Sequence, residues 1–111
     1  MPENTKYSLI MTSCSNRNEA DALALHILDK RLAACVSVIP GVRSHYWWEN
    51  KIESDNETVL LIKTESSRID ELISEIQEKH SYSNPEVIAL PIIDGSPAYL
   101  MWVSEVVGEK P

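Results

Sequence analysis

Arg31-Leu-Ala-Ala-Cys-Val-Ser-Val-Ile-Pro-Gly-Val-Arg-Ser-His-Tyr-Trp-Trp-Glu49 is the stretch of sequence that decides the fold. Its apolar run breaks at Pro40-Gly41, where a missing amide and a flexible residue suit a bulge or a sheet edge, and it ends in three consecutive aromatic residues. Glu49-Asn50 is the predicted turn, because Asn tolerates the left-handed backbone of tight hairpins. The return strand is expected from Lys51 to Thr64.

This predicted hairpin is unusually long. Its strands have roughly 14 residues each, against about five or six in an ordinary strand. Part of each strand should therefore project beyond a small sheet and leave unpaired backbone groups that a partner chain could cover. Because successive strand residues point to opposite faces, Trp47 and Trp48 should differ, with one buried and the other nearer a cleft or rim.

The rest of the chain alternates between strand and helix patterns. Asn16 and Glu19 form an Asn-x-x-Glu capping box at a helix start, and Ser66 or Ser67 is expected to cap a second helix. The expected elements are a strand over 6–13, a helix over 16–31, a helix from 66 to about 80, a strand over 87–93 and a short helix starting at Ser96-Pro97. The order strand-helix-strand-strand-helix-strand predicts an α+β fold, a ferredoxin-like βαββαβ sandwich in one domain over residues 1–111.

Composition excludes several classes of function. The chain has 111 residues and a formal net charge of -7, and its acidic residues are scattered without any run of Lys or Arg, so nucleic acid is not an expected partner. No leader pattern and no apolar stretch of the roughly 18 residues needed to cross a bilayer is found, which predicts a cytosolic protein without membrane contact. The two cysteines, Cys14 and Cys35, are expected to be free thiols.

Several motifs resemble those of one known family. Besides 31–49, they are Leu61-Ile-Lys-Thr64, His80-Ser-Tyr82 with Pro85-Glu86-Val87-Ile88, and Leu90-Pro-Ile92 followed by Tyr99-Leu100 and Trp102. In this order they resemble the CutA divalent-cation tolerance proteins. The resemblance implies a homotrimer in which long hairpins pair with neighbouring subunits, with an architecture similar to the PII signalling trimers. It also implies a role in tolerance or response to divalent cations, with copper as the leading metal.

Cys14 and His80 are the candidate metal ligands. A thiolate and an imidazole suit soft copper ions, and the resemblance points to a cysteine near the end of the first strand and a histidine before Tyr-x-x-Pro-Glu. The alternatives are a buried inert thiol and a histidine that stabilises a helix end. Cys35 is expected in the core, and His26 and His45 are weaker candidates. Two donors predict weak binding of copper or another divalent cation.

A second group of residues is expected to form a ligand cleft between subunits. By the resemblance, the cleft holds a metal, a small anion or an unassigned substrate, and the alternative is an interface ion pair between Lys63 and Glu86. The cleft residues are Trp48, Glu49, Lys51, Lys63, Tyr82 and Glu86. No catalytic motif is found, so the chain is not expected to be an enzyme. The other functions considered are a PII-like signalling or structural module that binds a small ligand or protein partner, and a cleft enzyme of unknown reaction.

Overall fold

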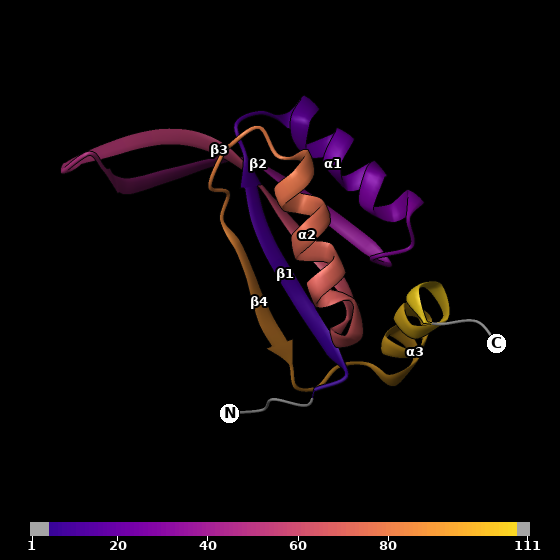
Figure 1. Ribbon diagram of the computed structural model, residues 1–111. Helices are drawn as coiled ribbons and strands as arrows, with labels where there is room; N and C mark the ends of the chain where they lie inside the picture. Colours follow the sequence, from indigo (N-terminus) through magenta and orange to yellow (C-terminus); the bar gives the residue numbers. More distant parts are fainter. Residues whose placement is uncertain (1–4, 109–111) are drawn as a thin grey trace.

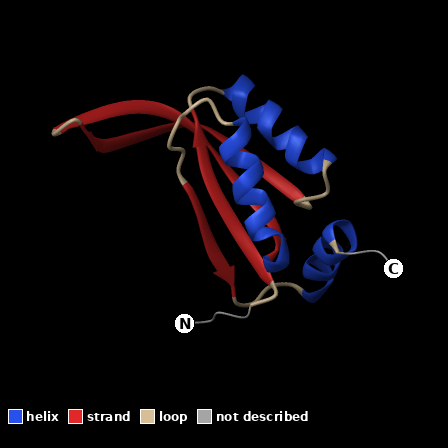
Figure 2. Ribbon diagram, viewed as in Figure 1, coloured by secondary structure: helices blue, strands red, loops and turns tan. Residues whose placement is uncertain are grey.

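A four-stranded antiparallel sheet forms the centre of the computed structural model, which describes residues 5–108 (Figure 1). The strand order is β2-β3-β1-β4, and helices α1 and α2 lie on the same face of the sheet (Figures 1 and 2). The elements in chain order are β1 (Tyr7–Cys14), α1 (Arg17–Asp29), β2 (Cys35–Trp48), β3 (Lys51–Glu65), the 3₁₀ turn η1 (Ser66–Arg68), α2 (Ile69–Lys79), β4 (Val87–Ile92) and α3 (Pro97–Val107). This is the order of elements that the sequence predicted.

The core lies between the sheet and the helices α1 and α2. Along β1 and the inner part of β3, from Thr58 to Thr64, alternate side chains are buried, and the cross-strand partners Ile10 and Ile62 lie on the same face. Ile27 of α1 and Ile76 of α2 complete the cluster, and all four residues are fully buried. Burying each of these side chains stabilises the fold by about 1.5–3 kcal/mol. The sheet therefore holds the ends of β1, α1 and α2 in fixed positions.

The two predicted helix caps have different outcomes. Asn16 caps α1 as expected, because its side-chain oxygen accepts a hydrogen bond from the Glu19 amide at 2.8 Å. The prediction that Ser66 or Ser67 caps the second helix is wrong, since α2 begins after η1 without a side-chain cap. The reason lies on the neighbouring strand β1, where the Ser66 hydroxyl bonds the Ser8 hydroxyl at 2.6 Å instead.

The long hairpin is confirmed and extends well beyond the sheet. β1 pairs with β3 only as far as Thr58, so beyond this point the outer parts of β2 and β3 pair only with each other in the part of the chain that the structure describes (Figure 1). We call this outer part, residues 42–57, the arm. A register shift between Ile39 and Val42 marks the predicted bulge, where Gly41 has a φ of 74°. At the tip, Glu49 and Asn50 both have left-handed backbones, as the turn prediction requires.

The face of the sheet opposite α1 and α2 is partly open. Leu9 and Met11 of β1 lie on this face, and they pair with Leu90 and Ile88 of β4. Ile88 is 45% exposed and Leu90 is 40% exposed. A strip of apolar side chains is therefore uncovered in the single chain. None of the helices within residues 5–108 combines the length and the apolar character needed to cross a membrane.

Candidate functional site

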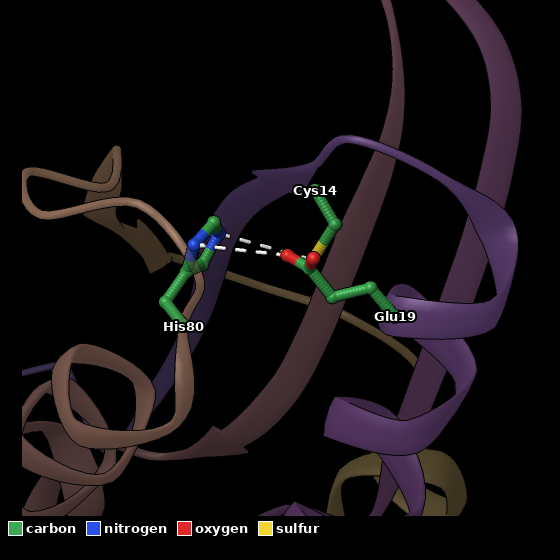
Figure 3. Close-up of side chains that lie close together, drawn as sticks. All are labelled: Cys14, Glu19 and His80. Atoms are coloured by element: carbon green, nitrogen blue, oxygen red, sulfur yellow. Dashed lines mark hydrogen bonds and ion pairs between the residues drawn. The ribbon is translucent and has the colours of Figure 1, made fainter.

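The structure brings Cys14 and His80 together. Cys14 is the last residue of β1, His80 follows the end of α2, and both side chains are buried. The distance from Cys14 Sγ to His80 Nε2 is 3.8 Å. Glu19, in the first turn of α1, joins them from the third side, and its Oε1 lies 3.8 Å from His80 Nδ1 (Figure 3). One potential ligand atom from each residue lies within 4.8 Å of the other two, and we call this group the thiol cluster.

Hydrogen bonds to the backbone hold the His80 ring. Nε2 lies 2.6 Å from the carbonyl oxygen of Ser13, and the amide of Tyr82 donates to Nδ1 at 3.0 Å. A carbonyl can only accept and an amide can only donate, so this pattern places the proton on Nε2 and leaves Nδ1 unprotonated. The ring therefore ties the end of β1 to the segment after α2. The alternative to metal binding predicted that the His80 side chain stabilises the end of its own helix. The His80 ring instead bonds the carbonyl of Ser13 in β1.

Burial keeps the Cys14 thiol protonated. It raises the pKa of this thiol from 9.0 to about 12, with Glu19 as the next cause, because a thiolate would lose water and face a carboxylate. The Glu19 carboxylate accepts hydrogen bonds from the hydroxyls of Ser15 and Ser81, so it does not act as the reciprocal half of a capping box. A soft cation entering the cluster must therefore displace the thiol proton and one partner of His80.

The other candidate ligands lie away from this cluster. His26 pairs with Glu75 of α2 at 2.7 Å, and His45 on the arm bonds Ser54. Cys35 is a free thiol, as predicted, but it is only partly buried and does not belong to the core cluster. That core prediction is wrong because Cys35 lies on the open side of the sheet, where the Lys63 ammonium is 3.8 Å from its sulfur.

Only three of the six predicted cleft residues line a common hollow. The hollow is about 800 Å³ in volume and lies between the arm and residues 82–86. Its lining residues are Ser13, Ser44, His45, Tyr46, Trp47, Trp48, Asp55, Glu57, Tyr82, Ser83, Asn84, Pro85 and Glu86. Glu49 and Lys51 belong to the exposed arm tip outside it, and Lys63 donates a hydrogen bond to Ser37 on the open sheet face. Within one chain, Lys63 and Glu86 are not among the ion pairs of the described residues.

The two arm tryptophans occupy opposite faces, as their neighbouring positions predict. Trp47 pairs with Ile52, and Trp48 pairs with Lys51 on the other face. Trp47 is 72% exposed and Trp48 is 61% exposed, so the prediction that one of them is buried is wrong for the single chain. The reason is that the arm projects beyond the sheet, so that no helix within residues 5–108 covers its tip (Figure 1).

Sequence reasoning missed Glu19, Asp55 and Glu57 as site residues. Glu19 was assigned only to helix capping, although its position one turn into α1 also places it beside the end of β1. Asp55 and Glu57 are two residues apart on β3 and therefore share one face of the arm. The i, i+2 spacing of Asp55 and Glu57 indicates that their side chains share a face of the strand. It does not indicate that this face lies toward residues 82–86, because that depends on the tertiary fold.

Fold and site together define a class of small α+β protein. In this class a long hairpin projects from a four-stranded antiparallel sheet, and a buried thiol, a buried imidazole and a partly buried carboxylate meet where that hairpin leaves the sheet. A model of the CutA1 divalent ion tolerance protein family matches residues 8–106, and the chain belongs to this family.

Relatives in distant organisms show the same likeness. The chain is 37% identical over 101 residues to the divalent-cation tolerance protein CutA of Archaeoglobus fulgidus, covering 91% of this chain and 98% of that protein. It is 41% identical over 102 residues to the chloroplastic protein CutA 1 of Oryza sativa, covering 92% of this chain and 58% of the relative. The chain thus spans little more than half the length of such plant and animal relatives.

A solved structure confirms that the fold is shared. The crystal structure of CutA1 from Oryza sativa superposes with a TM-score of 0.92 at 39% sequence identity, covering 96% of this chain and 97% of that chain. The resemblance inferred from the sequence motifs is therefore confirmed. Family membership supports a role in tolerance to divalent metal ions.

Proposed function

We propose that this chain is a cytosolic, ferredoxin-like homotrimer that contributes to divalent cation tolerance by binding copper weakly at the thiol cluster. The observation that carries the proposal is that Cys14, Glu19 and His80 each bring a ligand atom within 4.8 Å of the other two. Thiolate and imidazole together favour copper over hard cations, and reduced copper favours the sulfur most strongly. The carboxylate of Glu19 offers a weaker third ligand.

The contacts of the cluster explain why binding should be weak. The Cys14 thiol must lose a proton that burial holds tightly. His80 must exchange its bond to the Ser13 carbonyl or to the Tyr82 amide for a bond to the metal. Both changes oppose coordination, so this cluster suits reversible capture of excess copper better than permanent storage.

Titration with reduced copper tests this function. Wild type is expected to bind one ion per chain, and Cys14→Ser and His80→Gln should each weaken binding by at least about tenfold. Cys35→Ser is the matched control, because it removes the other thiol while leaving the cluster intact, and it should bind as wild type does. Binding that survives in both cluster variants, or that Cys35→Ser abolishes, would contradict the proposal.

The homotrimer is proposed from the open face of the sheet and from the arm. Ile88 and Leu90 form part of an uncovered apolar strip, and the outer edges of the arm have no neighbouring strand among the described residues. The family resemblance supplies the number three. Light scattering should give three times the chain mass of 12.5 kDa. A folded particle of 12.5 kDa would refute the assembly.

The hollow favours a second candidate function. A hollow of about 800 Å³ has the size of a small-molecule site, as expected of a PII-like signalling or structural module. Under this alternative the trimer responds to a small ligand or protein partner and metal binding is incidental. We propose no catalytic activity. The cytosolic location also stays a prediction, and the rice relative is named as chloroplastic.

A further inference from the structure

The arm builds one wall of the hollow, with the consecutive residues 44–48 of β2 and the carboxylates Asp55 and Glu57 of β3 in its lining. Ser44 lies opposite Asp55, Val42 opposite Glu57, and Tyr46 and Trp48 follow on the same face of β2. Tyr82 and Glu86 approach from the segment between α2 and β4, and Ser13 contributes from the end of β1. Two carboxylates and two aromatic rings are therefore presented side by side on one surface, facing a third ring and a third carboxylate.

Hydroxyl groups of neighbouring side chains bond two of the carboxylates of the hollow. Glu57 accepts hydrogen bonds from Ser13 at 3.2 Å and from Tyr82 at 3.3 Å, and Asp55 accepts one from the Tyr46 hydroxyl. All three donors are neutral. Among the described residues that line the hollow there is no Lys or Arg, and Glu86 has no ion pair within residues 5–108. Three carboxylates thus face one space; Asp55 and Glu86 are exposed to solvent, and His45 is the only basic side chain among the described lining residues.

The same negative field affects the two tyrosines. The pKa of Tyr82 is raised to about 12, first by burial and then by Glu57. The pKa of Tyr46 is also raised to about 12, chiefly by its hydrogen bond to Asp55. Both rings therefore stay neutral over the physiological range, with electron-rich faces that attract cations.

Aromatic rings beside the carboxylates indicate which kind of cation fits. A hard metal ion is held by oxygen ligands alone and gains nothing from Trp48 or Tyr46. An organic ammonium gains from both, because its charge pairs with a carboxylate and its methylene groups cover a ring. Asp55 and Glu57 are separated by about 6.6 Å along the strand, which suits ammonium groups joined by short methylene chains.

We propose that the hollow binds a linear oligoamine, with its ammonium groups on Asp55, Glu57 and Glu86 and its methylene chain along Trp48 and Tyr46. The site uses none of the three residues of the thiol cluster. It therefore stands or falls separately from the proposed copper function.

Calorimetric titration of spermidine into the assembled wild-type protein tests the proposal. Asp55→Asn and Glu86→Gln should each weaken binding about tenfold, the effect of losing one charged hydrogen bond. Trp48→Leu keeps an apolar side chain but removes the ring, and it should weaken binding about fivefold. Glu53→Gln is the matched control, because Glu53 lies on the same face of the arm without lining the hollow, and it should bind as wild type does.

Three results would overturn the proposal. One is the absence of spermidine binding to the assembled protein, as happens if a second copy of the chain fills the hollow. Another is a loss in Glu53→Gln equal to that in Asp55→Asn, which would reduce the effect to general surface charge. The third is calcium binding that depends on Asp55 and Glu86 but not on Trp48, since that is a metal site. Copper titration of these variants without spermidine should match wild type, which separates this test from the copper test.

Discussion

Copper affinity should rise about tenfold for each pH unit between about pH 6 and pH 8, because one thiol proton leaves for each ion bound. The sign follows from the raised pKa of Cys14: protons compete with the metal throughout this range, and binding weakens as the pH falls. In Cys14→Ser the slope should disappear.

The structure also sets the size of the effect. Burial raises the pKa of the Cys14 thiol from 9.0 to about 12. A difference of this size amounts to about 4 kcal/mol, so copper should bind about a thousandfold more weakly than at the same ligands with an ordinary thiol. Competition with a chromophoric chelator of reduced copper, at several pH values in degassed buffer, measures the affinity. A flat pH profile, or an equal slope in Cys14→Ser, would refute the reasoning.

Three further predictions concern the protein without metal. Glu19→Gln should lower the pKa of the Cys14 thiol, because a carboxylate that opposes the thiolate is removed; thiolate absorbance in an alkaline titration measures this, and an unchanged curve would exclude the interaction. His80→Ala should lower the free energy of unfolding by about 2–5 kcal/mol, since the Ser13 carbonyl and the Tyr82 amide lose their partner, whereas His45→Ala on the exposed arm should change it by less than about 0.5 kcal/mol; urea unfolding compares the two. Stability from the raised pKa values of Cys14 and Tyr82 should be fully present below their ordinary values of 9.0 and 10.0 and be lost as the pH rises toward about 12; denaturation at increasing pH tests this, and constant stability would contradict it.

Local rules predicted the parts of the fold that depend on neighbouring residues. The cap at Asn16, the turn at Glu49-Asn50 and the bulge near Gly41 follow from backbone preferences, and the structure confirms all three. The predicted Ser66 cap does not form because the Ser66 hydroxyl bonds the hydroxyl of Ser8 on β1. Such competition between tertiary and local hydrogen bonds is invisible in a single stretch of sequence.

The candidate site also has one part that residue types indicate and another part that depends on the tertiary fold. Cys14 and His80 could be nominated by residue type, but their approach depends on how β1 and α2 end relative to each other. Lys63 was grouped with Glu86 although β3 carries it to the open side of the sheet, far along the strand from the arm. The role of Glu57 depends on where residues 82–86 pass, and no periodicity in the sequence encodes that position.

The arm has a consequence for local stability. An isolated two-stranded ribbon is only marginally stable in water, and within residues 5–108 the outer strands of this arm pair only with each other. Its amides should therefore exchange hydrogen through local opening, while those of β1 and inner β3 exchange only when the whole sheet unfolds.

One wall of the hollow belongs to the arm, so the hollow keeps its shape only while the two strands of the arm stay paired. Contacts that slow exchange in residues 42–57 also preserve the alignment of Asp55, Glu57 and Trp48 against Tyr82. The lifetime of the arm, rather than the global stability of the sheet, thus sets how long this surface is available to a ligand.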